Sequence, residues 1–236
     1  MTGFGNSLRR LRCVFLDLDN TLYDADKIYQ YGLKLAWRYW CKQRSVSFRT
    51  FLRDYGVARR QVKADLRHST SSRNRVLYFK RITENVFGKP EPRLVLGMIK
   101  AYDQCWAKMD VQEARWVLSK LSKAYRIGIV TNQVCLTQLQ KIDRIDPESR
   151  WIKAIVTSEE VNSEKPRPRI FFEACRRIGF SPHQCVVIGD DWKMDVMGPL
   201  RYGFCSIFID PDQKRRSVKV PTVRHLRDVV RLLDKP

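Results

Sequence analysis

Two aspartates one residue apart follow the first strongly apolar stretch of the chain. The run Val14-Phe15-Leu16 leads into Asp17, and Asp19 stands two positions later, followed by Asn20-Thr21. Open parallel sheets bind ligands at the carboxyl ends of their strands. Two carboxylates there repel each other unless a cation lies between them or one keeps its proton. The pair therefore indicates metal or acid–base chemistry, and a simple turn of Asp, Asn and Thr is the alternative.

A second group of acids follows another apolar run late in the chain. The run Val186-Val187-Ile188-Gly189 leads into Asp190 and Asp191, and Asp195 comes shortly after. Carboxylate oxygens from two strand ends suit a hard cation, so the two groups together predict a Mg²⁺ site. Asp195 has a second interpretation, because an acid that opens a helix interacts favourably with the helix dipole.

Two further segments offer groups that can hold phosphate oxygens. Thr131 and Asn132 end an apolar run and supply a hydroxyl and an amide. Lys165 lies between Glu164 and Pro166, in a segment whose prolines restrict the backbone to extended conformations. A lysine held in this way can act as a point charge on phosphate. Taken singly, each feature is also typical of an ordinary strand end or exposed loop.

The order of these features is more specific than any one of them. Acids, then threonine, then lysine, then acids stand at the ends of successive expected elements. In this order the sequence resembles the haloacid dehalogenase superfamily. The residues that carry the resemblance are Asp17-Leu18-Asp19-Asn20-Thr21, Thr131, Lys165 and Asp190-Asp191. It covers residues 1–23 and about 108–210, and it is tightest from Thr157 to Gly203.

The resemblance implies a role for each matching residue. Asp17 would attack phosphorus as a covalent nucleophile, and Asp19 would act as general acid and base. Thr131, Asn132 and Lys165 would bind the substrate phosphate, and Thr131 and Lys165 would also balance the charge of the transition state. Superfamily members that cleave carbon–halogen bonds lack the second acid, so Asp19 favours phosphoryl transfer.

Mg²⁺ is the cofactor that the resemblance implies. Its ligands would be the Asp17 side chain, the Asp19 backbone carbonyl, Asp190 and waters. Asp191 or Asp195 would orient a ligand or add one, and the sequence leaves open which of the two does so.

Strands and helices alternate among the elements expected to position these residues. Short apolar runs predict buried strands over residues 12–17, 126–131, 153–157, 185–190 and 204–209. Helical patterns occupy residues 111–124, 136–142, 169–178 and 194–202. This alternation predicts a doubly wound, mainly parallel, Rossmann-like α/β sheet.

Residues 24–107 interrupt the alternation. They show helical periodicity and aromatic residues at helical spacing, among them Tyr29, Trp37 and Trp40. We expect an all-helical domain over residues 24–107, inserted into an α/β core of residues 1–23 and 108–236. Members of the superfamily carry a helical cap at this place. The aromatic stripe is interpreted as the core of the helical bundle, and Ser69-Thr70-Ser71-Ser72 as a loop.

Net charge sets this chain apart from an ordinary small-molecule phosphatase. The chain has 45 Lys and Arg against 25 Asp and Glu, a formal net charge of +20. The helical insertion holds 18 of these basic residues against 7 acids, and Lys214-Arg215-Arg216 with Lys219 forms another basic stretch. Such a balance favours anionic partners, nucleic acid among them. A basic surface without a polyanionic partner is the other interpretation.

Cysteine usage and hydropathy indicate the setting of the protein. Seven cysteines are scattered without a Cys-x-x-Cys pair, as in a reducing compartment. No apolar run approaches the ~20 residues of a membrane span. The basic residues before Cys13 are interpreted as a lead-in to a strand and not as a signal peptide. We expect a cytoplasmic protein without membrane association, and the oligomeric state stays open.

Two functions remain after these observations. The first is Mg²⁺-dependent hydrolysis of a small phosphorylated metabolite. Residues 19–23, Asp-Asn-Thr-Leu-Tyr, are similar to the branch that contains pyrimidine nucleotidases, which makes a nucleoside monophosphate one candidate substrate. The alternative is a protein of this fold that acts on or binds nucleic acid or another polyanion, with or without catalysis. The intact motifs favour the first.

Overall fold

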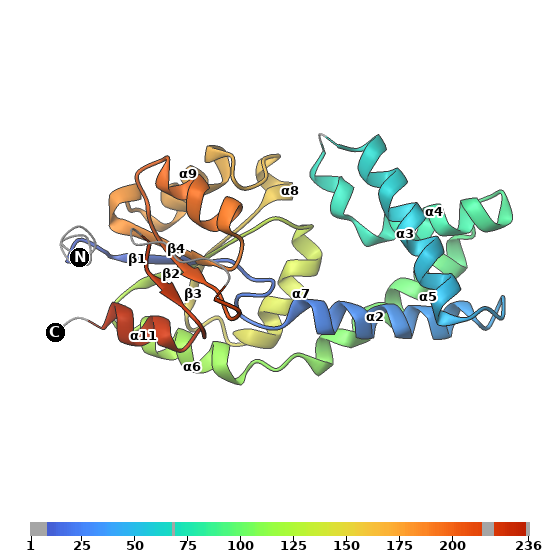
Figure 1. Ribbon diagram of the computed structural model, residues 1–236, viewed down its shortest axis with the longest axis horizontal. Helices are drawn as coiled ribbons and strands as arrows, with labels where there is room; N and C mark the ends of the chain where they lie inside the picture. The colour runs from blue at the N-terminus through green and yellow to red at the C-terminus, as the bar shows by residue number, and fades with distance from the viewer. Residues whose placement is uncertain (1–8, 68, 214–219, 235–236) are drawn as a thin grey trace. The chain divides into compact units, whose positions relative to one another are not determined.

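The computed structural model describes residues 9–67, 69–213 and 220–234 of the 236-residue chain, so the basic stretch at 214–219 lies outside the described residues. The chain divides into two compact units. The first, called the sheet unit here, comprises Met1–Asp24 and Asp110–Pro236; the second, the helical unit, comprises Ala25–Met109. Every labelled strand in Figure 1 belongs to the sheet unit.

Six parallel strands form one sheet in the order β3-β2-β1-β4-β5-β6. Their bounds are β1 Cys13–Leu16, β2 Arg126–Thr131, β3 Ile152–Thr157, β4 Cys185–Gly189, β5 Cys205–Ile209 and β6 Thr222–Val223. The first five coincide with the apolar runs of the sequence, because both faces of a parallel sheet are covered and its residues are buried. β6 was not expected, since a strand of two residues carries no periodicity.

Helices cover both faces of this sheet, with α9 on one face and α6 and α11 on the other (Figure 1). Their bounds are α6 Gln112–Leu121, α7 Cys135–Ile145, α8 Ser158–Val161, α9 Pro168–Ile178, α10 Gly198–Leu200 and α11 Asp228–Leu233. A 3-10 helix, η3, spans Pro182–Gln184. In the core, Phe171 of α9 packs in one cluster with Phe15 and Val187 of the sheet. The prediction of a doubly wound α/β fold is confirmed.

The segment at 194–202 differs from the single helix that was expected. It forms a π-helix, η4, over Trp192–Met197, and α10 then continues the chain for three residues. Pro199 lies in α10 and has no backbone N–H to donate into the preceding turn. Single π-helical turns are frequent at functional sites, and this one contains the buried Asp195.

The helical unit contains four α-helices among its described residues. They are α2 Ala25–Trp40, α3 Phe48–Asp65, α4 Arg75–Phe87 and α5 Pro92–Asp103, with 3-10 helices η1 Thr70–Arg73 and η2 Gln104–Lys108. Trp40 packs against Phe51 and Phe87, with ring centroids 6.1 and 5.5 Å apart, and is buried. Tyr29 and Trp37 of the aromatic stripe are half-buried. The segment expected as a loop at 69–72 is instead helical from Thr70, because the Ser69 side chain caps η1 at the Ser71 N–H.

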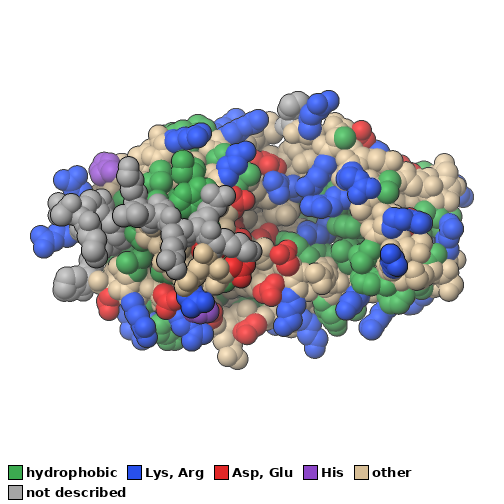
Figure 2. Space-filling model, viewed as in Figure 1, with side chains coloured by type: hydrophobic (Ala, Val, Ile, Leu, Met, Phe, Trp, Pro, Cys, Tyr) green, Lys and Arg blue, Asp and Glu red, His purple; other side chains and the backbone are tan. Residues whose placement is uncertain are grey.

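Basic side chains reach the surface over both units on the face drawn in Figure 2. Among the described residues no helix combines the length and the hydropathy that crossing a bilayer requires. All seven cysteines are free thiols, and Cys13, Cys105, Cys175 and Cys185 are buried.

Candidate active site

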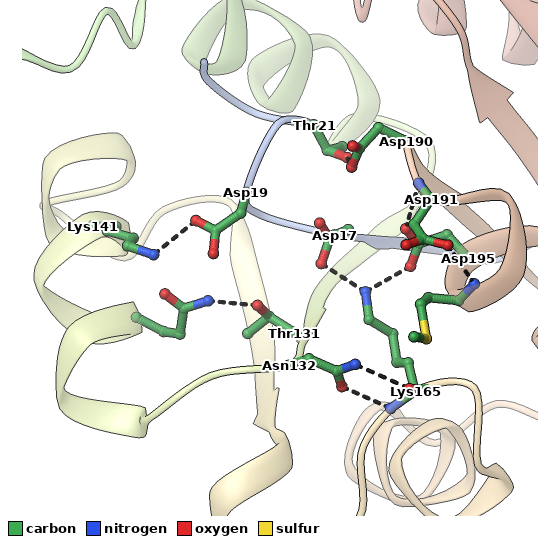
Figure 3. A network of polar contacts seen from close by, with 12 residues as sticks. Asp17, Asp19, Thr21, Thr131, Asn132, Lys141, Lys165, Asp190, Asp191 and Asp195 are labelled. Atoms are coloured by element: carbon green, nitrogen blue, oxygen red, sulfur yellow. Dashed lines mark hydrogen bonds and ion pairs between the residues drawn. The ribbon is translucent and has the colours of Figure 1, made fainter. Parts of the chain in front are cut away.

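The four features of the sequence meet at one edge of the sheet. β1 lies between β2 and β4, so Asp17, Thr131 and Asp190 all stand where these three parallel strands end. The strand order departs from β1 in both directions here, which is the position where open α/β sheets bind ligands. Figure 3 shows the side chains converging from three strand ends, from α7 and from the loop that carries Lys165.

Lys165 is the centre of the site. Its Nζ lies 2.6 Å from Asp17 Oδ1 and 2.6 Å from Asp195 Oδ1 (Figure 3). The Lys165 side chain is 3% exposed and that of Asp195 is 1% exposed, so the charges are removed from water. A buried ammonium is costly unless it is paired and hydrogen-bonded, and here two carboxylates pair it.

Asn132 fixes the backbone of Lys165. Its Oδ1 accepts from the Lys165 N–H at 2.7 Å, and its Nδ2 donates to the Lys165 carbonyl at 3.0 Å. Both polar atoms of this amide are therefore occupied by one neighbouring residue. The geometry favours a role for the Asn132 side chain in holding the lysine loop, while its predicted direct contact with phosphate stays a prediction.

Burial governs the electrostatics of the acids. It raises the pKa of Asp17 above its usual range, and the charges of Asp195 and Asp19 add to this, although Lys165 opposes it. Burial likewise raises the pKa of Asp190 to about 6, with the charge of Asp17 as the next cause. For Lys165, burial lowers the pKa, but the charges of Asp17 and Asp195 outweigh it and the net shift is upward. One ammonium shared among several acids cannot offset all of their desolvation.

The carboxylates fit a hard divalent cation. Ligand oxygens of Asp17, Asp190 and Asp195 lie within 4.8 Å of one another. Oxygen ligands of this kind suit Mg²⁺, and a divalent cation beside them would oppose the rise in carboxyl pKa that burial causes. Thr21 Oγ1 donates to Asp190 Oδ1 at 3.2 Å, which orients that carboxylate.

The structure separates the two acids that the sequence left as alternatives. Asp195 belongs to the carboxylate cluster and is buried. Asp191 is exposed, and its Oδ1 accepts from the backbone N–H groups of Lys193 and Met194. The helix-capping role considered for Asp195 thus falls to Asp191, while a role of either acid at a metal stays a prediction.

Asp19 faces a partner that sequence reasoning missed. Lys141 of α7 places its Nζ 2.7 Å from Asp19 Oδ1 and is fully buried. The Tyr23 hydroxyl donates to the same oxygen at 2.5 Å. The carboxylate of Asp19 is therefore not part of the cluster of Asp17, Asp190 and Asp195, which agrees with a metal contact through its backbone carbonyl alone.

Thr131 also has a buried partner on α7. Gln138 Nε2 donates to Thr131 Oγ1 at 2.5 Å, and both residues are buried. Because the threonine oxygen accepts this bond, its own hydrogen stays available for a phosphate oxygen. Gln138 and Lys141 stand three residues apart, so they share one face of α7. That spacing of two polar residues among apolar ones is the signal that could have drawn attention to them.

Comparisons with known proteins identify the relatives of this chain. A model of the haloacid dehalogenase-like hydrolases matches residues 11–203. The chain is 30% identical over 209 residues to a glyceraldehyde 3-phosphate phosphatase of Methanothermobacter thermautotrophicus. The aligned residues make up 86% of this chain and 87% of that protein. It is 31% identical over 206 residues, 85% of each chain, to a ribulose-1,5-bisphosphate 5-phosphatase of Halopiger xanaduensis. An N-acylneuraminate-9-phosphatase of Rattus norvegicus is 28% identical over 211 residues, 83% of this chain and 81% of that protein.

Solved structures share the fold. A haloacid dehalogenase-type phosphatase from Thermococcus onnurineus superimposes with a TM-score of 0.69 at 19% identity, over 94% of this chain and 98% of that chain. A 2-haloacid dehalogenase from Pseudomonas syringae gives a TM-score of 0.72 at 20% identity, with the same coverage. The family match over most of the chain, and relatives at 30% identity or more that are phosphatases, show that this protein belongs to the haloacid dehalogenase-like hydrolases, as an enzyme of phosphatase type.

Proposed function

We propose that this protein is a Mg²⁺-dependent phosphomonoesterase that acts through an aspartyl-phosphate on a small phosphorylated metabolite. One observation supports this above all. The buried Lys165 bridges Asp17 and Asp195, while Asp19 is paired separately with Lys141. A nucleophile next to a positive charge, with a separate acid nearby, is the arrangement that phosphoryl transfer through a carboxylate requires.

Hydrolysis proceeds in two displacements. A carboxylate oxygen of Asp17 forms a bond to phosphorus while the ester P–O bond breaks, and Asp19 gives its proton to the leaving oxygen, which departs as an alcohol. Asp19, now a carboxylate, takes a proton from water as the water oxygen bonds to phosphorus. The bond between phosphorus and Asp17 breaks, inorganic phosphate forms, and both acids return to their starting states.

The remaining residues hold charge and geometry. Lys165 and the Thr131 hydroxyl face the phosphate oxygens and stabilise the charge that spreads over them in the transition state. Asn132 keeps the Lys165 backbone in place through its two hydrogen bonds. Asp17, the Asp19 carbonyl, Asp190 and Asp195 as a supporting acid would hold Mg²⁺. When bound, Mg²⁺ supplies positive charge that reduces the repulsion between nucleophile and phosphate.

The class of substrate is proposed from the relatives. Their names specify glyceraldehyde 3-phosphate, ribulose 1,5-bisphosphate and N-acylneuraminate 9-phosphate as substrates of those proteins. We propose a phosphorylated sugar or related acid for this chain, with a nucleoside monophosphate as a further candidate. The role of residues 24–107 as a cap, the cytoplasmic location and the binding of nucleic acid stay predictions.

Phosphate release from a panel of esters tests this proposal. The panel contains the three phosphates named above, nucleoside monophosphates and oligonucleotides with terminal phosphates, each with Mg²⁺ and with a chelator. We expect Mg²⁺-dependent release that Asp17→Asn lowers by more than about 10³-fold. Asp143→Asn, a change of the same kind at an exposed position of α7, is the matched control and should retain full turnover. Activity of more than a few per cent in Asp17→Asn would contradict the covalent mechanism.

A further inference from the structure

Helix α7 carries two buried polar side chains that point into the site. Gln138 and Lys141 are each 0% exposed, whereas Asp143 and Arg144 on the same helix are exposed. Figure 3 shows Lys141 extending from α7 toward Asp19. Gln138, on the same helix, donates to Thr131 instead. One helix face thus supports a phosphate-binding hydroxyl and the general acid and base separately.

Two donors meet on one oxygen of the Asp19 carboxyl group. Lys141 Nζ and the Tyr23 hydroxyl both bind Oδ1, at 2.7 and 2.5 Å, and neither contact uses Oδ2. Tyr23 is itself fixed, because its side chain is only 6% exposed and its ring lies 5.9 Å from the Lys141 ammonium. Two donors on a single oxygen restrain the rotation of the carboxyl group.

Stability alone does not account for a lysine in this place. A buried ion pair gains little over well-packed apolar residues of similar size, because desolvation cancels most of the attraction. A methionine or leucine at position 141 would fill the same volume without that cost. The 2.7 Å contact with the proposed general acid is the feature that an apolar residue could not provide.

We infer that Lys141 is a positioning residue that holds Asp19 through Oδ1, so that the carboxyl group is oriented to give a proton to the leaving oxygen and later to accept one from water. This inference rests on the proposed function. It assigns Lys141 to the acid–base half of the reaction, with Tyr23 as its partner, and assigns Gln138 to the phosphate-binding half. Lys141 is needed most for esters whose leaving group is a poor one, such as the alkoxide of a metabolite.

Leaving-group dependence separates these two halves. The probes are the best alkyl phosphate of the panel and 2,4-dinitrophenyl phosphate, whose leaving group departs without a proton. General acid catalysis typically contributes about 10²–10⁴-fold. The ratio kcat/KM reports the first displacement alone, because release of the leaving group ends that step. Lys141→Met should therefore lower kcat/KM on the alkyl ester by roughly 100-fold and on the aryl ester by less than about 3-fold. Tyr23→Phe should show the same selectivity with a smaller loss.

Gln138→Leu is the matched control, because it changes another buried polar residue of the same helix, three residues away. Its contact is with Thr131, so it should lower activity on both esters by the same factor and raise KM. Lys141→Arg restores a donor at position 141 and should recover part of the alkyl-ester activity. Melting temperatures of all variants establish whether each is folded. If Lys141→Met is not folded, the selectivity of Tyr23→Phe between the two esters tests the assignment instead.

Each result has a definite meaning. An equal loss of kcat/KM on both esters in Lys141→Met and Tyr23→Phe, or no loss on the alkyl ester, overturns the assignment while the phosphatase function stands. A wild-type protein that releases phosphate from neither ester fails the proposed function itself. Selective loss on the alkyl ester in the variants, with a uniform loss in Gln138→Leu, supports the assignment.

Discussion

The two ends of the sheet carry their positive charges in opposite ways. At the carboxyl end, Lys165 and Lys141 are buried and each lies within 2.7 Å of a carboxylate oxygen. At the amino end, Arg126, Arg150 and Lys153 are exposed, and the ion pair of Arg150 with Glu148 leaves the arginine side chain 65% exposed. The same residue types thus serve in one place as fixed parts of a site and in the other as solvated surface.

A cavity of about 450 Å³ marks the amino end, lined by Ser122, Tyr125, Arg126, Arg150, Trp151 and Lys153. None of the residues at the carboxyl edge lines it, so the proposed chemistry and the basic cavity occupy opposite ends of the strands. The site is therefore built from buried charge pairs and does not depend on the net charge of +20. Desolvated pairs fix geometry and shift pKa values, whereas exposed charges act mainly on distant partners and are screened by salt.

Removal of the central buried lysine should have the largest effect. Lys165→Met leaves Asp17 and Asp195 buried and facing each other without a cation, so we expect about 3–5 kcal/mol of destabilisation and at least about 10²-fold slower turnover. Urea unfolding and phosphate release measure the two effects. The exposed Lys153→Met is the matched control and should change the free energy of unfolding by less than about 0.5 kcal/mol. Equal effects of the two changes would show that burial does not distinguish the role of Lys165 from that of an exposed lysine.

The pH dependence of stability should show the acid cluster directly. Asp190 has a pKa of about 6 in the folded protein against 3.8 ordinarily, so the folded state binds more protons than the unfolded state between these values. The contribution of Asp190 to the free energy of unfolding is therefore fully present below about pH 4 and is lost as the pH rises through about 6. The raised pKa of Asp17 acts in the same direction. For Asp190 alone, the free energy of unfolding should fall by an amount on the order of 2–3 kcal/mol.

Melting curves in chelator at pH 4.5 and 7.5 check this expectation. The melting temperature should fall with rising pH, and Asp190→Asn should remove part of that fall. Added Mg²⁺ should raise the melting temperature more at pH 7.5 than at pH 4.5, since it binds the ionised carboxylates. A melting temperature with the same pH dependence in Asp190→Asn and wild type would count against a raised Asp190 pKa.

A single methyl group at Gly189 should disturb the carboxyl end without changing any charge. A Cβ at this position would lie 2.3 Å from Asp195 Oδ2, so Asp195 would have to move away from Lys165. We expect Gly189→Ala to cost about 1–3 kcal/mol and to slow turnover. In Gly56→Ala, within α3, the nearest atom is 3.6 Å away, and this control should stabilise by about 0.5–1 kcal/mol. Full activity in Gly189→Ala would show that Asp195 tolerates displacement.

The exposed cations should give the smallest effect on folding and turnover. Combined replacement of Arg126, Arg150 and Lys153 by alanine should change the free energy of unfolding by less than about 1 kcal/mol and leave turnover of a small ester within about 2-fold. The variant should elute from immobilised heparin at lower salt than wild type, because fewer counterions are released. A large loss of turnover here would show that the amino end takes part in the reaction.

Sequence reasoning succeeded where a local pattern reports directly on the structure. Buried parallel strands read as continuous apolar runs, so β1 to β5 were found, and the acids that follow β1 and β4 were placed at one edge. The short β6 and the π-helix at 192–197 were missed, because neither has a period of its own. Asp191 and Asp195 could not be separated, since both are acids in the same turn and only burial distinguishes them.

Residue types at fixed spacing along the chain were enough to predict the family, the sheet and the order of the motif residues. The contacts of Lys165 with Asp17 and Asp195, and of Lys141 with Asp19, which is 122 positions away in the sequence, became visible only in the folded chain. The physical reason is that desolvation and pairing are set by neighbours in space. A lysine in the sequence is solvated by default, and it becomes part of a site only when folding buries it against an acid.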